Sequence, residues 1–267
     1  MARLAILSLG ALHITLDDMP LTAFDSDKAR ALLVYLAVES HCEHRREFLA
    51  ELFWPESPKD RAHHTLSQVL YNVRLVIGDR RTGQSPPFLD VTRKALRFNR
   101  ASDYWLDVEL FAALPRSGTQ QALERCEQAI TVYRGYFLAE LSIDDSPMFE
   151  EWLMLQRGRW RRTAVETLNR LIEGYTNLYD YDKALHYAWK QLDFDPWRED
   201  AHRQVMRLLT LSGQRTAALI QYEVCCQTLM QEFGVEPEAE TVAMYQAIKV
   251  GAIASEHRQQ SDARSIL

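Results

Sequence analysis

The sequence predicts a mainly α-helical fold with a small β component, arranged in two parts. Short strand-like runs occur only in the first 24 residues and around residues 88–98, and helical periodicity dominates the rest of the chain. An Ala-Leu pair also recurs in the second half, at positions 184 and 218. We therefore expect an α/β domain over residues 1–101, an all-α domain over 102–250 and a flexible tail or linker over 251–267.

Positive charge is concentrated in one segment. Residues 59–100 carry nine Lys or Arg against three Asp, a net charge near +6 in a chain whose total is −6. Residues 102–267 carry 17 basic and 25 acidic side chains. A basic segment in an acidic protein is typical of proteins that bind a polyanionic partner at one site. The uneven charge also suggests two domains with different partners.

Other patterns argue against several classes of function. There is no Gly-rich phosphate loop, GxSxG or HExxH motif, so we expect neither an enzyme nor a cofactor. His41-Cys42-Glu43-His44 has metal-binding residue types but no second cluster, and a polar turn explains it better than zinc. The cysteines lack CxxC spacing and are expected to be reduced thiols, and neither a signal peptide nor a membrane-spanning apolar run occurs. These features predict a cytoplasmic protein.

The first part should combine a small sheet with three helices. Strand-like runs lie at residues 4–9, 12–16 and 21–24, and we expect them to form an antiparallel sheet. Helices are expected over about residues 26–37, 46–53 and 58–77. Ser26 is a suitable N-cap for the first. Phe53 and Trp54 end the second helix, beside its apolar stripe, and are predicted to be core residues.

A basic hairpin follows the third helix. Its arms are residues 88–91 and 95–98, with Arg93 and Lys94 at the turn. The order of strands, three helices and hairpin is the layout of a winged helix-turn-helix. In that layout, the helix at about 59–77 enters the major groove of double-stranded DNA, and the wing at about 88–98 contacts the backbone or minor groove.

The third helix has two contrasting faces at 100° per residue. One face is apolar: Ala62, Leu66, Val69, Leu70, Val73 and Ile77. The opposite face is rich in hydrogen-bonding groups and poor in acids: Arg61, His64, Ser67, Gln68, Tyr71 and Asn72. These groups can contact phosphates and base edges. The alternative is a helix face that only meets solvent.

Each group on the polar face has an expected role. Gln68 and Asn72 can each offer a donor and an acceptor to adenine, and Arg61 can fork onto guanine or phosphate. The other three are expected to contact either bases or backbone: His64, Ser67 and Tyr71. Tyr71 has the alternative of packing against the loop at Arg80-Arg81.

Basic residues beside this helix are candidate phosphate contacts. Arg93 and Lys94 would reach the minor groove or its phosphates, or would only keep an exposed hairpin soluble. Arg74 contacts phosphate or pairs with Asp60 or Asp79.

Two further arginines, Arg45 and Arg46, stand at the start of the second helix. Exposed backbone N–H groups there also attract phosphate. Both arginines have the alternative of pairing with Glu47 or Glu51.

From Asp103 onward every strong signal is helical. Helices are expected over about residues 105–114, 119–132, 147–176, 180–194, 197–211, 214–233 and 238–249. Ala184-Leu185 and Ala218-Leu219 have the spacing of tetratricopeptide repeats, in which small residues let paired helices approach closely. Such an array has a concave face that would mediate dimerisation, contact RNA polymerase or bind further domains.

Both parts resemble the antibiotic regulatory protein (SARP) type of bacterial transcriptional activator, an OmpR-like winged helix followed by a bacterial transcriptional activator domain. The resemblance covers about residues 3–250. It rests on Lys28-Ala-Arg-Ala-Leu-Leu, Leu49-Ala-Glu-Leu-Phe-Trp-Pro55, Leu66-Ser-Gln-Val-Leu-Tyr-Asn-Val-Arg74, Asp103-Tyr-Trp-Leu-Asp107 and Phe233-Gly-Val-Glu-Pro-Glu238.

The resemblance implies a DNA-binding activator that often binds as a pair to tandem direct repeats and contacts RNA polymerase. The chain departs from the family pattern at Arg45-Arg46, where Ser or Thr is common, and at Tyr71 and Asn72, where basic or small residues are common. The competing interpretation is a protein-interaction scaffold whose winged helix does not read DNA.

Overall fold

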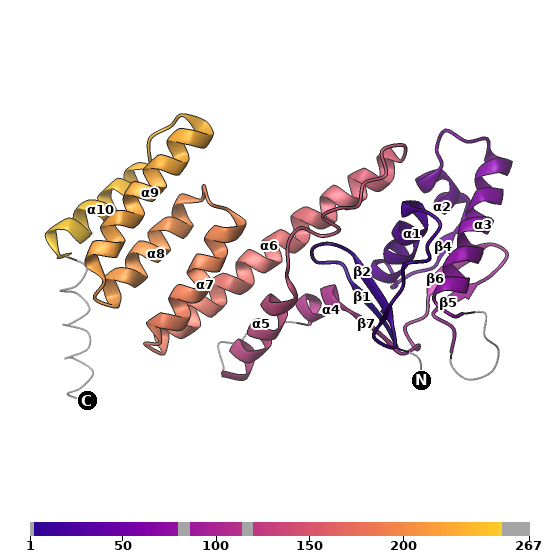
Figure 1. The fold of residues 1–267 in the computed structure, drawn as a ribbon, viewed down its shortest axis with the longest axis horizontal. Helices are drawn as coiled ribbons and strands as arrows, with labels where there is room; N and C mark the ends of the chain where they lie inside the picture. Colours follow the sequence, from indigo (N-terminus) through magenta and orange to yellow (C-terminus); the bar gives the residue numbers. More distant parts are fainter. Residues whose placement is uncertain (1–2, 80–85, 114–119, 253–267) are drawn as a thin grey trace. The chain divides into compact units, whose positions relative to one another are not determined.

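A computed structural model describes residues 3–79, 86–113 and 120–252 (Figure 1). The chain forms two compact units, residues 1–114 with 128–164 and residues 115–127 with 165–267. Helices α5 (Gln120–Val132) and α6 (Pro147–Asn177) each have residues in both units. The mainly helical fold with a small β component is confirmed, and the first unit extends well beyond residue 101. The loop at Arg80-Arg81 and nearly all of the expected tail lie outside the described residues.

The first unit begins with a four-stranded sheet in the order β3-β2-β1-β7. Its strands are β1 (Leu4–Leu7), β2 (His13–Leu16), β3 (Met19–Pro20) and β7 (Tyr104–Leu106). The first three pair antiparallel, and β7 pairs parallel to β1 with Leu4 opposite Tyr104. Leu4 and Ile6, which are two positions apart, both point into the core, as a strand with one buried face requires.

Two details of this sheet differ from the sequence-based expectation. Residues 21–24 are not a strand, because the third strand consists only of Met19–Pro20 and the chain then turns toward the first helix. Strand β7 occupies part of the segment expected to begin a helix at residue 105, and α4 (Asp107–Ala112) starts after it. The partner of β7 lies about a hundred residues earlier in the chain, so no local pattern marks it.

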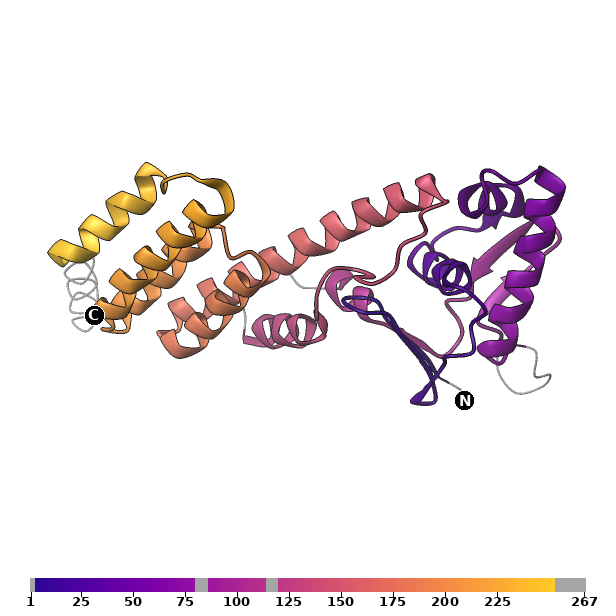
Figure 2. The ribbon, with the colours of Figure 1, turned by 45° about the horizontal axis from the view of Figure 1, so that its top comes forward.

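Three helices and a hairpin complete the winged helix, as the sequence predicts (Figure 2). They are α1 (Asp27–Val38), α2 (Arg46–Phe53), α3 (Lys59–Val76), β5 (Leu89–Val91) and β6 (Ala95–Phe98). The Ser26 side chain accepts a hydrogen bond from the Ala29 N–H and caps α1. The two-residue strand β4 (His44–Arg45) pairs with β6 immediately before α2 begins.

Residues 128–164 contribute directly to the core of the first unit. The Tyr35 ring of α1 packs against Trp152 of α6 at a centroid distance of 4.9 Å, and the Phe53 ring of α2 packs against Phe149 of α6 at 5.2 Å. Glu39, at the end of α1, accepts a hydrogen bond from the Trp152 indole at 2.8 Å. Phe53 is fully buried as predicted, whereas Trp54 is half-buried.

A buried carboxylate joins the segment that follows β1 to α4. Asp107 accepts hydrogen bonds from the Ser8 and Leu9 N–H groups at 2.6 and 2.7 Å and from the Ser8 hydroxyl at 2.7 Å. Burial raises the pKa of Asp107, and these three donors oppose the rise by favouring the charged form. The motif residue Asp107 therefore has a structural role.

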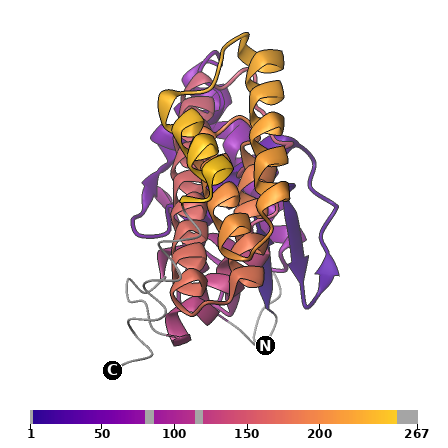
Figure 3. The same ribbon diagram turned by 90° about the vertical axis from the view of Figure 1, so that its left-hand side faces the viewer.

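The second unit is a helical array (Figure 3). Its helices α7 (Tyr181–Phe194), α8 (Glu199–Leu211), α9 (Arg215–Phe233) and α10 (Ala239–Val250) pack side by side in sequence order. Ala184 and Ala218, the small residues of the predicted repeat, are fully buried. This agrees with the tetratricopeptide-like arrangement that the sequence predicts.

The described ranges contain neither a membrane span nor a metal cluster. None of their helices has the length and apolarity needed to cross a membrane. Their His, Cys, Asp and Glu side chains form no group of three that could hold a metal ion. His44, in the turn with metal-binding residue types, is buried with Nε2 3.1 Å from the Glu39 carbonyl oxygen.

Candidate nucleic-acid interface

Most of the polar face predicted for α3 is exposed. Arg61, His64, Gln68 and Tyr71 all lie at the surface, and the Tyr71 side chain is 55% exposed. The opposite face buries Ala62, Leu66, Leu70 and Val73. Asp60, in the first turn, is the one acidic residue of this helix. Beyond that turn the exposed face presents only cationic, neutral polar and apolar groups.

Asn72 is the exception: it is buried, whereas the sequence predicts that it lies on the outward face. The residue is only 7% exposed. Its Oδ1 accepts a hydrogen bond from the Asp25 N–H at 3.2 Å, and its Nδ2 donates to the Ala23 carbonyl oxygen at 3.4 Å. Asn72 lies at the edge of the polar arc, where the segment before α1 packs against the helix.

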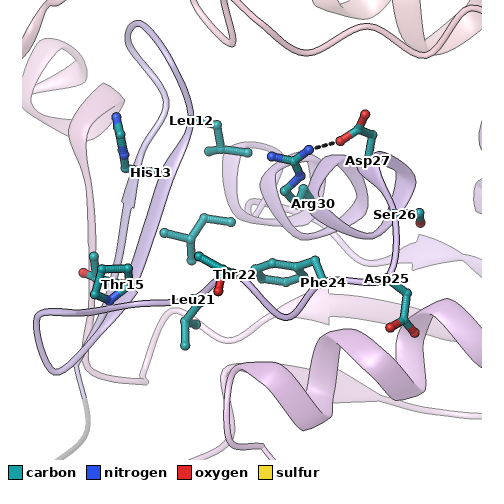
Figure 4. Close-up of a pocket in the computed structure, with 12 residues that line it drawn as sticks. Leu12, His13, Thr15, Leu21, Thr22, Phe24, Asp25, Ser26, Asp27 and Arg30 are labelled. Carbon is teal, nitrogen blue, oxygen red and sulfur yellow. Dashed lines mark hydrogen bonds and ion pairs between the residues drawn. The ribbon is translucent and has the colours of Figure 1, made fainter.

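The segment that Asn72 holds also forms part of the wall of a pocket. Residues 12–15, 20–22 and 24–27, together with Arg30, line an open cavity of about 530 Å³ (Figure 4). Figure 4 shows Leu12 and Phe24 on either side of this space, with Arg30 paired to Asp27 at its edge. Asn72 therefore fixes the segment between the sheet and α1.

Ser67 and Arg46 form a hydrogen-bonded link between α3 and the wing. The Ser67 hydroxyl donates to the His63 carbonyl oxygen at 2.9 Å and accepts from Arg46 Nη1 at 3.2 Å. Arg46 Nε also donates to the Thr92 carbonyl oxygen at 3.2 Å, and the Arg46 N–H donates to the Lys94 carbonyl oxygen at 2.9 Å. This one residue connects the start of α2, the middle of α3 and the turn of the hairpin.

The turn of the wing is ordered by Thr92. Its hydroxyl oxygen accepts hydrogen bonds from the N–H groups of Lys94 and Ala95, at 3.3 and 2.9 Å. Arg93 and Lys94 are both exposed at this turn. A short, locally hydrogen-bonded turn holds two cationic side chains where a wing would meet a phosphate backbone.

The remaining predicted cations differ in exposure. Arg45, at the N-cap position of α2, is exposed. Arg74 is half-buried, and its Nε is buried with no hydrogen-bond partner in the part of the chain that the structure describes. Burial raises the pKa of the nearby Asp79 carboxyl, and the charge of Arg74 offsets part of that rise. Arg74 thus lies beside Asp79, one of the two partners considered for it.

One exposed residue of this face was not singled out from the sequence. Leu75 lies one turn beyond Tyr71 and is 56% exposed. An exposed leucine on a helix that enters the major groove can contact a thymine methyl group. Its spacing of four residues from Tyr71 was the available signal, but a leucine in an amphipathic helix is ordinarily assigned to the core.

Comparison with known proteins identifies the second part of the chain. The family model described as the bacterial transcriptional activator domain matches residues 106–249, more than half of the sequence. Two curated relatives are the transcriptional regulatory protein MoaR1 of Mycobacterium bovis (strain BCG / Pasteur 1173P2) and that of Mycobacterium tuberculosis (strain ATCC 25618 / H37Rv). Each is 24% identical over 250 residues, which cover 90% of this chain and 77% of the relative.

A solved structure extends the similarity to the whole fold. The chain is similar to Mycobacterium tuberculosis EmbR, determined in complex with a low-affinity phosphopeptide, with a TM-score of 0.68 and 20% sequence identity. The match covers 100% of this chain and 71% of EmbR. The chain therefore belongs to the bacterial transcriptional activator domain family, and its winged helix in front of that domain makes it a SARP-type transcriptional regulator.

Proposed function

We propose that the protein is a sequence-specific DNA-binding transcriptional activator, with α3 in the major groove and the wing on the backbone or minor groove. The exposed face of α3 carries this proposal, because it offers hydrogen-bonding groups without an acid beyond its first turn. The cationic wing turn is tied to the same helix through Arg46. Membership of a family of transcriptional regulators supports the same conclusion.

Exposure and existing hydrogen bonds suggest a role for each residue. Gln68 reads a base edge, with adenine as its natural partner, and Arg61 contacts guanine or phosphate. The other exposed groups contact bases or backbone: His64, Tyr71 and Leu75. The exposed cations outside α3 neutralise phosphates: Arg45, Arg93 and Lys94.

Selection from a random pool of DNA duplexes tests the proposal and identifies the operator sequence in the same experiment. The full chain should enrich one sequence motif at low salt, and its affinity should fall steeply as salt is added. A pool with no enriched motif and no gel shift at micromolar protein would instead favour a scaffold whose winged helix does not read DNA.

Two sets of variants separate base reading from phosphate contact. Gln68→Ala should weaken binding to the selected motif by about 1–3 kcal/mol and relax the preference at one base pair. Gln227→Ala, at an exposed position of α9, is the matched control and should change nothing. Joint replacement of Arg93 and Lys94 by Gln should reduce the slope of log affinity against log salt by roughly 2.

We further infer that the activator pairs on tandem direct repeats and contacts RNA polymerase, as the resemblance to SARP-type regulators implies. Footprinting on a selected duplex carrying two copies of the motif should protect both copies together. Transcription from such a template by purified polymerase should rise when the protein is added, and Gln68→Ala should abolish the rise. Activation that persists without DNA binding would contradict this arrangement.

A further inference from the structure

A second cavity lies in the first unit, among α1, α4 and α6. Its volume is about 410 Å³, within the range of small-molecule sites. Apolar side chains from the winged helix and from the region of β7 and α4 form much of its wall, including Val38, Leu106 and Val108. The DNA-reading residues proposed above do not line this cavity.

Cationic groups surround this apolar wall. Arg100 and Arg159 both line the cavity and are exposed. Within the described ranges, neither has a carboxylate oxygen within 4 Å. Glu109 is the one acidic residue in the lining, and it accepts a hydrogen bond from the Tyr104 hydroxyl at 2.8 Å. The lining therefore holds two guanidinium groups and one carboxylate, an excess of positive charge.

Trp160 adds an aromatic side chain to the cavity wall. Its ring lines the cavity and is only 4% exposed, and Arg159 lies over the ring with its Cζ 4.6 Å from the centroid. The indole Nε1 is buried and has no acceptor among the residues that the structure describes. Because Nε1 is itself closed to solvent, Trp160 offers the cavity other atoms of its ring and not this N–H group.

We propose that this cavity binds a small amphiphilic organic anion. The apolar body of the ligand packs against Val38, Leu106 and Val108, and its carboxylate, sulfonate or phosphate group is held by Arg100 and Arg159. The Trp160 side chain adds to the wall against which the ligand packs. This inference goes beyond DNA reading, and its test does not require DNA.

The fluorescent anion 1-anilinonaphthalene-8-sulfonate is a suitable probe, and N-phenyl-1-naphthylamine is its neutral counterpart. The full chain should bind the sulfonate with saturable fluorescence at least tenfold more tightly than the amine. Arg100→Gln and Arg159→Gln should each weaken sulfonate binding about five- to tenfold. Arg207→Gln, at an exposed position of α8, is the matched control and should leave binding unchanged.

A second set of variants tests the cavity independently of charge. Ala112 is exposed on α4 and lines the cavity, so Ala112→Phe fills the space and should abolish binding. Trp160→Phe keeps an aromatic ring in the wall and should retain binding within about twofold of the wild type. Circular dichroism identifies any variant that fails to fold, and the binding affinities of the remaining variants then test the proposal. Equal affinity for sulfonate and amine, or wild-type affinity in all folded variants, would overturn the proposal.

Discussion

The Arg46 side chain acts at the scale of a single residue on three elements. Its guanidinium bridges Thr92 in the wing turn and Ser67 on α3, so it is engaged within the protein and is a positioning residue for the wing. Neighbouring Arg45 is exposed and remains a candidate phosphate contact. Two adjacent arginines with the same charge thus have different structural roles.

A double-mutant cycle distinguishes these roles. Arg46→Met should weaken DNA binding roughly fivefold, because about one kcal/mol of hydrogen bonding that orients the wing is lost. In that background Lys94→Met should cost less than it does in the native protein, with a coupling above about 0.5 kcal/mol. The pair Arg45→Met and Lys94→Met should be additive. Additive losses for Arg46 and Lys94 as well would show that Arg46 does not act through the wing.

His202 is a buried imidazole with both nitrogens engaged. Its Nε2 lies 2.7 Å from the Pro196 carbonyl oxygen, and its Nδ1 lies 2.7 Å from Gln221 Nε2. The neutral ring satisfies both contacts by donating from Nε2 and accepting at Nδ1. Burial lowers the pKa of His202 below its ordinary value near 6.5. The folded chain therefore resists protonation that the unfolded chain accepts.

The stability of the protein should depend on pH through His202. At pH above about 6.5, the pKa of the unfolded chain, His202 is neutral in both the folded and the unfolded chain, and its contribution to stability is fully present. As the pH falls below that value, the unfolded chain takes up a proton first, and stability is lost. The loss is at most about 1.4 kcal/mol per pH unit for one group. Urea unfolding at pH 7.5 and 5.5 should show a smaller loss on acidification for His202→Gln than for the native protein. Exposed His186→Gln should behave as the native protein does, and an equal loss in all three would refute the assignment.

At the scale of elements, α6 contains two glycines in different surroundings. A Cβ added at Gly174 would lie 2.4 Å from Leu123 Cδ2, a distance that real Cβ atoms essentially never show. A Cβ at Gly158 would meet only Arg162 Nη1, at 3.5 Å. Gly174 therefore permits close contact between α5 and α6 within the second unit, whereas Gly158 has no such steric requirement.

Alanine at these two positions should have opposite effects. Gly158→Ala should stabilise the protein by about 0.5–1 kcal/mol, because alanine favours the helix. Gly174→Ala should destabilise it by about 1–3 kcal/mol, because the clash with buried Leu123 outweighs that gain. Denaturant unfolding of both variants measures the difference, and Leu123→Ala should relieve the clash in a Gly174→Ala background. A stabilising Gly174→Ala would show that Leu123 adapts freely.

The sequence was most informative for elements with a long, regular pattern. Periodicity located α2 at its observed ends and placed α1, α3 and the later helices to within a few residues. It failed for β7, whose partner β1 is remote in sequence, and for residues 21–24, where a short apolar run becomes a loop. Short segments carry too little local information, and contacts distant in the chain decide their structure.

The candidate interface shows the same limit. The exposed positions of Arg61, His64, Gln68 and Tyr71 followed from helical geometry alone. The burial of Asn72 did not, because it depends on a loop from a distant part of the sequence that packs against the edge of α3. The internal hydrogen bonds of Arg46 likewise depend on where the wing lies.

At the scale of the whole molecule, the first compact unit does not end with the winged helix. It includes residues 128–164, which supply Phe149 and Trp152 to the aromatic cluster around Tyr35 and Phe53. It also includes β7, the parallel neighbour of β1. The family model that begins at residue 106 therefore overlaps the unit that presents α3.

Fragments should reveal this dependence. A fragment of residues 1–101 lacks β7, Phe149 and Trp152 and should unfold without a cooperative transition, because its aromatic core is uncovered. A fragment of residues 1–164 should melt cooperatively when followed by circular dichroism. The prediction fails if residues 1–101 alone show the same midpoint as residues 1–164.

The aromatic cluster of Tyr35, Phe53, Phe149 and Trp152 also limits where hybrid proteins can be joined. In a hybrid joined at residue 101, the winged helix of a relative would pack against Phe149 and Trp152 of this chain, which fit the rings of Tyr35 and Phe53. Transfer of DNA-sequence preference between relatives should therefore succeed when residues 128–164 are transferred together with the winged helix, or when only the exposed residues of α3 are substituted.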